Sequence, residues 1–151
     1  MRIMAIDYGD ARTGVAVSDE SASLTGDTWV VHSRRETDTV SAIINEAVIR
    51  GVSRIVVGLP KNMDGSIGTR AEKCTHFADL LRTSIKQMQS PSGSLEIEVE
   101  LMDERLTTMS AHRILNEVGK FGKKRKKTVD AVAASLILED YLRSSKLSSK
   151  L

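Results

Sequence analysis

Four acidic residues stand at positions from which a carboxylate can take part in chemistry. Asp7 ends an apolar N-terminal stretch, Asp103 and Glu104 follow a stretch of alternating polarity, and Asp130 lies in the first turn of a helical pattern. Ligand sites of α/β proteins gather at the ends of strands. If three of these acids converge, their mutual repulsion favours a bound cation, and carboxylate oxygens suit hard divalent cations.

Two divalent ions about 3.5–4 Å apart can activate a water molecule and stabilise the leaving oxygen of a phosphodiester. The acids therefore indicate phosphodiester hydrolysis, and the serine, histidine and cysteine residues form no elbow or triad motif that would supply another nucleophile. For Asp130 a purely structural role stays open, because an acid in a first helical turn interacts favourably with the helix dipole, by about 0.3–1 kcal/mol.

The elements that would hold these acids follow from the hydropathy pattern. Apolar or alternating stretches predict strands, and apolar positions three and four residues apart predict helices. The expected strands cover residues 2–8, 13–18, 28–33, 54–58 and 96–102, and the apolar stripes of the expected helices lie within 37–50, 74–88, 111–118 and 129–141, the last helix beginning at Thr128. This order predicts an α/β protein with a mixed five-stranded sheet flanked by helices, which is the element order of the ribonuclease H-like fold.

Length and composition exclude several classes of protein. Residues 1–151 amount to one domain, and 40% hydrophobic with 28% charged residues is typical of a globular protein. Five aromatic residues are too few for a surface that stacks bases, which excludes RRM-like and OB-like modules. No apolar run approaches the ~20 residues that cross a bilayer, so we expect a cytoplasmic protein without membrane contact. One cysteine and three scattered histidines match no zinc-ligand spacing.

Positive charge is concentrated in residues 120–127. Six of the 22 basic residues lie there, and the remaining 16 face 20 acidic residues, which leaves the rest of the chain at −4. Such a cluster is typical of contact with a phosphate backbone, although a solvated loop that aids solubility has the same composition. We expect a disordered basic loop at about 119–127 and a frayed tail at 144–151.

Four motifs follow one another along nearly the whole chain: DYGDARTGVAVSD at 7–19, VGLPKNMDG at 57–65, DERLTT at 103–108 and VDAVAASLIL at 129–138. Together they closely resemble the YqgF/RuvX family. The resemblance implies a bacterial cytoplasmic nuclease with a ribonuclease H-like fold, related to the RuvC Holliday junction resolvases. Family members are described as Holliday junction resolvases and as nucleases that process pre-16S rRNA. One departure is Ser110, where members often carry a glutamate that completes a helix capping box.

The resemblance also implies a site. The acids of the family motifs fall on Asp7, Glu104 and Asp130, as catalytic residues and as ligands of Mg²⁺ or Mn²⁺, with two ions expected. Asp103 is the weaker candidate of its pair, although its alternation with Ile97, Val99 and Leu101 points it to the apolar face of its strand.

Substrate contacts are expected from a basic and polar set: Arg12, Lys61, Asn62, Arg105, Lys123, Lys124, Arg125, Lys126 and Lys127. Gly65 and Gly68 allow a phosphate to approach the backbone of the loop after the fourth strand, and Arg70 lies near enough in sequence to contact it. The same loop can simply join a strand to a helix, and Arg12 and Arg105 can simply neutralise the neighbouring acids.

The function expected is metal-dependent hydrolysis of phosphodiester bonds in structured nucleic acid. The substrate is the 5′ end of pre-16S rRNA during ribosome biogenesis, or a Holliday junction, and a symmetric resolvase would need a homodimer. The alternative is a non-catalytic RNA-binding assembly factor, which the basic segment serves equally well. Asp-x-Gly followed by Thr-Gly also resembles the first phosphate motif of the actin and sugar-kinase superfamily, but those proteins close two such domains around ATP and this length supplies one.

Overall fold

A single mixed β-sheet forms the centre of the molecule. The computed structural model describes residues 1–62, 64–88, 96–103 and 122–149, and for 122–129 and 146–149 it describes the backbone alone. The five strands are β1 (Arg2–Asp7), β2 (Arg12–Ser18), β3 (Thr25–His32), β4 (Val52–Leu59) and β5 (Glu98–Asp103). Their order in the sheet is β3-β2-β1-β4-β5.

The pairing directions decide which chain ends meet. β1 pairs with β2 and β2 with β3 in antiparallel fashion, whereas β1 pairs with β4 and β4 with β5 in parallel fashion. The C-terminal ends of β1, β3, β4 and β5 and the N-terminal end of β2 therefore lie at the same edge of the sheet. We call this edge the catalytic edge, after the catalytic role that the sequence analysis expects for Asp7, which ends β1 there.

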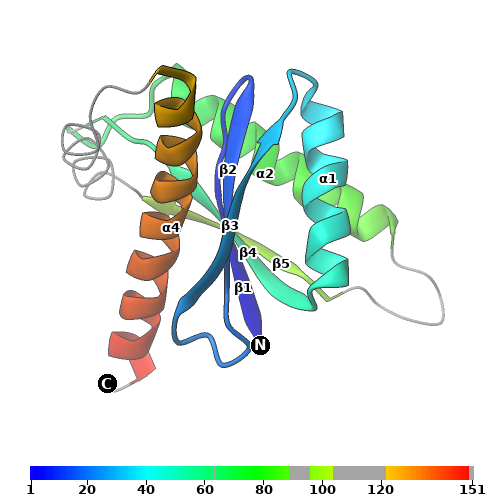
Figure 1. The fold of residues 1–151 in the computed structure, drawn as a ribbon, viewed down its shortest axis with the longest axis vertical. Helices are drawn as coiled ribbons and strands as arrows, with labels where there is room; N and C mark the ends of the chain where they lie inside the picture. Colours follow the sequence, from blue (N-terminus) through cyan, green and yellow to red (C-terminus); the bar gives the residue numbers. More distant parts are fainter. Residues whose placement is uncertain (63, 89–95, 104–121, 150–151) are drawn as a thin grey trace.

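Helices cover both faces of the sheet (Figure 1). α1 (Glu36–Ile49) and α2 (Thr69–Gln87) pack on one face, and α4 (Gly122–Ser149) packs on the other, against β1, β2 and β3. Alternate residues of each strand supply two separate cores. Met4, Ile6 and Val15 belong to the larger core beneath α1 and α2, whereas Ile3, Ala5 and Ala16 belong to the core beneath α4. No helix in the described part of the chain is both long enough and apolar enough to span a membrane.

The observed boundaries differ from the expected ones mainly in β3 and α4. β3 begins at Thr25, three residues before the expected start at residue 28. α4 begins at Gly122 and ends at Ser149, so its backbone includes 122–127 and 144–149, which we expected in a loop and in a frayed tail. Lysine and arginine favour helix nearly as well as alanine, so the charged run can continue a helix. The helix expected around 111–118 and residues 119–121 of the expected loop lie outside the described residues.

Candidate functional site

Two of the predicted acids come to the catalytic edge from the two ends of the chain. Asp7 is the last residue of β1, and it alternates with Ile3 and Ala5, whose side chains lie beneath α4. Because successive side chains of a strand point to opposite faces, Asp7 shares the α4 face. Asp130 lies in the third turn of α4, on the helix that covers that same face, and not in a first helical turn as the sequence indicated, because α4 begins at Gly122. The fold therefore places Asp7 and Asp130 on the same face of the sheet, where the charge of Asp130 acts on Asp7.

Burial and mutual repulsion act on Asp7. The pKa of Asp7 is raised from 3.8 to about 6, mainly by burial and further by the charge of Asp130, while the charge of Arg70 acts in the opposite direction. A carboxyl group that is buried beside a second acid holds its negative charge poorly unless a cation lies nearby.

Asp130 has a cationic partner from the sheet. Arg12, the first residue of β2, donates from Nε to Oδ2 of Asp130 over 3.0 Å. Burial raises the pKa of Asp130, and the charges of Arg12 and of His32 lower it. Arg12 and His32 are cross-strand partners in the β2–β3 ladder, so both lie on the α4 face.

A glycine in β2 allows α4 to approach the sheet at this point. A Cβ atom at Gly14 would overlap the backbone carbonyl oxygen of Asp130. Any larger residue at position 14 would hold the helix away from the strand. Gly14 therefore sets the depth at which Asp130 meets the catalytic edge.

On the opposite face, α2 holds the turn that follows Asp7. The guanidinium group of Arg70 donates to the backbone carbonyl of Tyr8 and lies 3.4 Å from Oδ1 of Asp10. It also lies 5.7 Å from the ring centroid of Tyr8, whose ring stacks on Phe77 at 4.1 Å. Arg70, which lies near enough in sequence to contact a phosphate at this loop, contacts protein atoms beside Asp7 in this structure.

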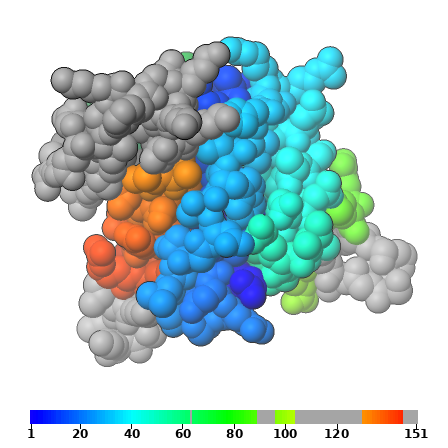
Figure 2. Space-filling model, viewed as in Figure 1, coloured from blue at the N-terminus to red at the C-terminus, as the bar shows by residue number. Residues whose placement is uncertain are grey.

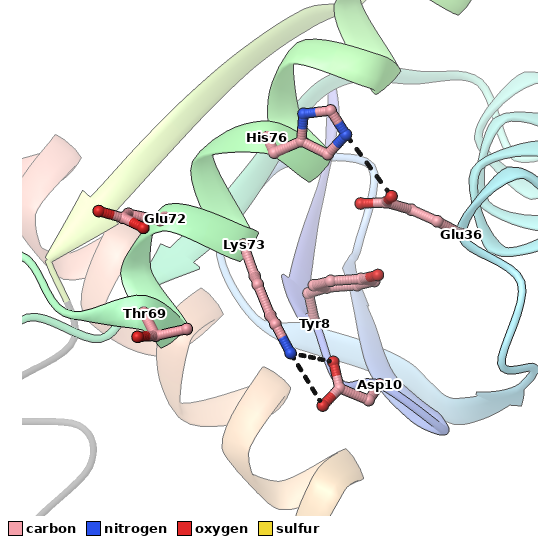
Figure 3. Close-up of a pocket in the computed structure, with 7 residues that line it drawn as sticks. All are labelled: Tyr8, Asp10, Glu36, Thr69, Glu72, Lys73 and His76. Carbon is pink, nitrogen blue, oxygen red and sulfur yellow. Dashed lines mark hydrogen bonds and ion pairs between the residues drawn. The ribbon is translucent and has the colours of Figure 1, made fainter.

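A hollow of about 320 Å³ lies beside this turn (Figure 3). It is lined by Tyr8, Asp10, Glu36, Thr69, Glu72, Lys73 and His76. Lys73 lies 3.3 Å from Asp10, and His76 of α2 lies 3.6 Å from Glu36 of α1. Burial, followed by the charges of Glu36 and Asp10, raises the pKa of Tyr8 to about 12. Three carboxylates against one lysine make this hollow unfavourable for a phosphate.

The loop after β4 lies at the catalytic edge and is held by its own side chains. Asn62 donates from its side-chain amide to Oγ of Ser66 over 3.0 Å, and Asp64 accepts the backbone N–H of Ser66 at 2.8 Å. Gly65 has a φ of 87°, which favours glycine. Lys61 and Asn62 therefore lie on a preformed turn, at the edge where we expected them to contact substrate.

Asp103, the last residue of β5, does not share a face of the sheet with Asp7. Asp103 pairs with Leu59. By strand alternation it lies on the same face of β5 as Val99 and Leu101, which pack in the core beneath α1 and α2. It therefore lies on the face opposite to Asp7, and its side chain is exposed. The apolar face that we expected for Asp103 is thus the face away from the other acids.

Some of the predicted site lies beyond what the structure describes. Glu104, Arg105 and the side chains of Lys123, Lys124, Arg125, Lys126 and Lys127 are outside the described part. Among the side chains that are described, no three His, Cys, Asp or Glu residues form a metal-ligand group. The predicted set of three acids therefore stays a prediction, of which Asp7 and Asp130 are placed.

His32 is a residue of the site that the sequence reasoning missed. The position of His32 could have been predicted from the sequence, because the third strand of an antiparallel meander ends at the same edge of the sheet as the first strand. The role of Arg70 carried no such signal, since it depends on how α2 packs against the turn after β1.

Comparison with known proteins supplies independent information. Residues 1–144 match the family model described as RuvX: Holliday junction resolvase. A protein of Halothermothrix orenii, provisionally named a pre-16S rRNA nuclease, is 43% identical over 145 residues, which are 94% of each chain. A protein of Acetivibrio thermocellus with the same name is 41% identical over 148 residues, 95% of this chain and 96% of its own.

Solved structures show the same fold at low sequence identity. T. thermophilus RuvC in complex with a Holliday junction substrate gives a TM-score of 0.58 at 13% identity, with 96% of each chain covered. Fowlpox virus resolvase in complex with Holliday junction DNA gives 0.56 at 11% identity, with 95% of this chain and 98% of that chain covered. The predicted ribonuclease H-like fold is thereby confirmed. Because the family model covers 144 residues and the relatives are more than 40% identical over most of their length, the chain belongs to the RuvX family.

Proposed function

We propose that this protein is a metal-dependent nuclease that hydrolyses phosphodiester bonds of structured nucleic acid in the cytoplasm. The observation that carries the proposal is the pair of acids, Asp7 and Asp130, brought to one face of the catalytic edge in a member of the RuvX family. The names of the relatives favour the 5′ end of pre-16S rRNA as substrate. The family description and the RuvC complex favour a four-way DNA junction as the second substrate.

The acids fit a hard divalent cation. Carboxylate oxygens are the ligands that Mg²⁺ and Mn²⁺ prefer, and a cation would offset the repulsion between Asp7 and Asp130. Bound ions of this kind supply an activated water and stabilise the leaving oxygen of a phosphodiester. Arg12 contacts Oδ2 of Asp130, so it orients that carboxylate and brings a positive charge to the place where a scissile phosphate would lie.

We assign the third ligand to Glu104 and not to Asp103. Asp103 lies in register with Leu59, on the face that packs beneath α1 and α2. A ligand that shares ions with Asp7 must reach the α4 face instead. Glu104 is the next acid in the chain, and the strand alternation that excludes Asp103 favours its neighbour.

Substrate contacts are proposed for two groups of residues around these acids. Lys61 and Asn62 lie on the turn after β4 at the catalytic edge, and Arg12 lies at the start of β2. Arg105 and the five basic residues at 123–127 complete the proposed set. Junction resolution would further require a homodimer, since two symmetric cuts need two sites.

The test is a cleavage assay with three labelled substrates: a 5′ fragment of pre-16S rRNA, a four-way DNA junction and duplex DNA. The wild-type protein with Mg²⁺ or Mn²⁺ should cut at least one of the structured substrates. Asp7→Asn and Glu104→Gln should abolish cleavage, whereas Asp103→Asn, the matched control one residue away, should keep it. Binding of the RNA fragment with no cleavage of any of the three substrates under either metal would refute the nuclease and favour the RNA-binding alternative.

A further inference from the structure

The segment between β3 and α1 carries exposed positive charge next to the catalytic edge. We call residues His32, Ser33, Arg34 and Arg35 the β3–α1 arm. The side chains of His32, Arg34 and Arg35 are exposed. In Figure 2 the blue of β3 adjoins the cyan of α1 on the surface that faces the viewer.

The arm begins beside the proposed active site. His32 is the cross-strand partner of Arg12, the residue that holds Asp130. The next residue, Ser33, donates its backbone N–H to the carbonyl of Ala11 over 3.1 Å. The arm therefore continues the positive charge of Arg12 outward along the β3 side of the catalytic edge.

The arginines of the arm form no ion pair with a carboxylate in the described part of the chain. The acid nearest in sequence, Glu36, instead lies 3.6 Å from Nε2 of His76 on α2 (Figure 3). Exposed guanidinium groups without a carboxylate partner are suited to bind an anion from outside the protein.

Local structure gives no reason for these arginines. Arg35 occupies the N-cap of α1 and makes no side-chain cap hydrogen bond. Serine, threonine, aspartate and asparagine are the residues that stabilise this position, and the positive end of the helix dipole disfavours cations there. Residues that contradict the local preference are expected where function requires them.

The backbone of the arm is nevertheless held in place. Oγ of Ser33 accepts the N–H of Arg35 at 3.1 Å and donates to its carbonyl at 3.2 Å. The hydroxyl of Thr39, in the first turn of α1, donates to the same carbonyl over 3.2 Å. A ligand therefore has to order only the side chains, which lowers the entropy lost on binding.

We propose that the β3–α1 arm binds the phosphate backbone of the substrate strand on the β3 side of the active site, through Arg34 and Arg35. The inference rests on the proposed nuclease function and adds a binding surface to it. One strand of a duplex carries one phosphate per ~3.4 Å of helix axis, and two neighbouring arginines match two phosphates of such a backbone. The shared ligand is a phosphodiester backbone, of RNA or of DNA.

The experiment measures binding without cleavage, in an Asp7→Asn background and with EDTA present. The probes are the single-stranded 5′ fragment of pre-16S rRNA and the four-way DNA junction, followed by fluorescence anisotropy over a series of salt concentrations. Arg34→Ser combined with Arg35→Ser should weaken binding. The salt slope is the slope of the logarithm of the binding constant against the logarithm of the salt concentration. Its magnitude should decrease by about 1.4 for the single strand and about 1.8 for the junction, at ~0.7 and ~0.9 per contact.

A matched control removes two positive charges from elsewhere. Lys86 lies in the last turn of α2, and Arg143 lines a hollow with Leu24 and Thr25, where the β2–β3 turn enters β3, so both lie away from the catalytic edge. Lys86→Ser combined with Arg143→Ser should leave the salt slope unchanged. Equal losses in the two double variants, or no loss in either, would overturn the proposal, because the effect would then be one of net charge or absent.

A stability measurement separates binding from a structural role. Arg35→Ser supplies the missing N-cap, so the melting temperature should rise by about 2–4 °C while affinity falls. A fall in melting temperature with unchanged affinity would show a structural arginine and overturn the proposal. The binding assay needs neither metal nor cleavage. A wild-type protein that never cuts would therefore refute the nuclease, while the salt slope would still test whether the arm binds phosphate. A wild type that cuts, with an unchanged slope in the arm variant, refutes the arm alone.

Discussion

Asp7 makes the stability of the metal-free protein depend on pH. Its pKa is 3.8 in the unfolded chain and about 6 in the folded protein, so between these values the folded state holds a proton that the unfolded state has released. Stability should therefore fall as the pH rises from about 4 to about 6, and remain lower above it. Asp7→Asn should raise the free energy of unfolding at pH 8 by about 1–3 kcal/mol, at ~1.4 kcal/mol per pKa unit.

Urea unfolding in EDTA at pH 4 and pH 8 measures this effect. Asp10→Asn is the control, because its hydrogen bond to Lys73 lowers the pKa of Asp10, and neutralising it should not stabilise the protein. Asp130→Asn should gain less than Asp7→Asn, since it also removes the partner of Arg12. A stability of wild type that rises between pH 4 and pH 6 while that of Asp7→Asn stays flat would contradict the prediction.

Arg70 and Lys73 form a second matched pair of residues. Both contact Asp10, but only Arg70 also binds the carbonyl of Tyr8, next to Asp7. Arg70→Gln should lower kcat of cleavage with little change in KM, because it frees the backbone that positions Asp7. Lys73→Gln should change both by less than about twofold, since an exposed ion pair contributes only about 0–1 kcal/mol. In steady-state kinetics, an Arg70→Gln variant with a raised KM and an unchanged kcat would show that Arg70 does not position Asp7.

At the level of the elements, the contact between β2 and α4 depends on Gly14. A methyl group at this position overlaps the backbone of Asp130, so the helix must shift. Gly14→Ala should therefore cost about 1–3 kcal/mol of stability and reduce cleavage, because Asp130 moves with the helix. Gly68→Ala is the control, since its Cβ would meet only the side chain of Asn62, at 3.5 Å. Urea denaturation of both variants measures the difference, and equal stabilities would show that α4 adapts.

The hydropathy pattern was the most informative part of the sequence. Its apolar N-terminal stretch predicted Asp7 at a strand end, and the α/β fold followed from the order of the elements. The start of β3 was less predictable, because Gly26 and Asp27 do not favour strand and are held there by pairing with β2. The start of α4 was masked by charge, since lysine-rich sequence is common both in loops and in helices.

The site was predictable only in part. The sequence indicated Asp7 and Asp130 as acids at element ends, and the packing of α4 on β2 puts them on one face. The contact of Arg70 with the Tyr8 carbonyl could not be predicted, because it arises from the docking of α2 and leaves no spacing pattern in the chain. Glu104 stays a prediction beyond the described residues.

Across the whole molecule, the proposed substrate contacts come from separate elements of the fold. The β3–α1 arm is one of them, and the basic residues at the start of α4 belong to another element. Replacing Lys123, Lys124, Arg125, Lys126 and Lys127 by glutamine keeps helix propensity and removes charge. This variant should fold, bind nucleic acid more weakly, and lose about 0.7 in salt slope per lost single-strand contact. Circular dichroism checks the folding, and an unchanged slope would place the phosphates at Arg12, Lys61 and the arm.

The topology also determines when the proposed active site can form during protein synthesis. Asp7 is made with the first strand, and Asp130 is made on a helix that follows all five strands. A ribosome-bound nascent chain that has completed the sheet still lacks Asp130. It also exposes the apolar face of Ile3, Ala5 and Val56, which α4 covers in the folded protein. The emerging polypeptide therefore passes the translating ribosome, with its rRNA, without a complete pair of acids.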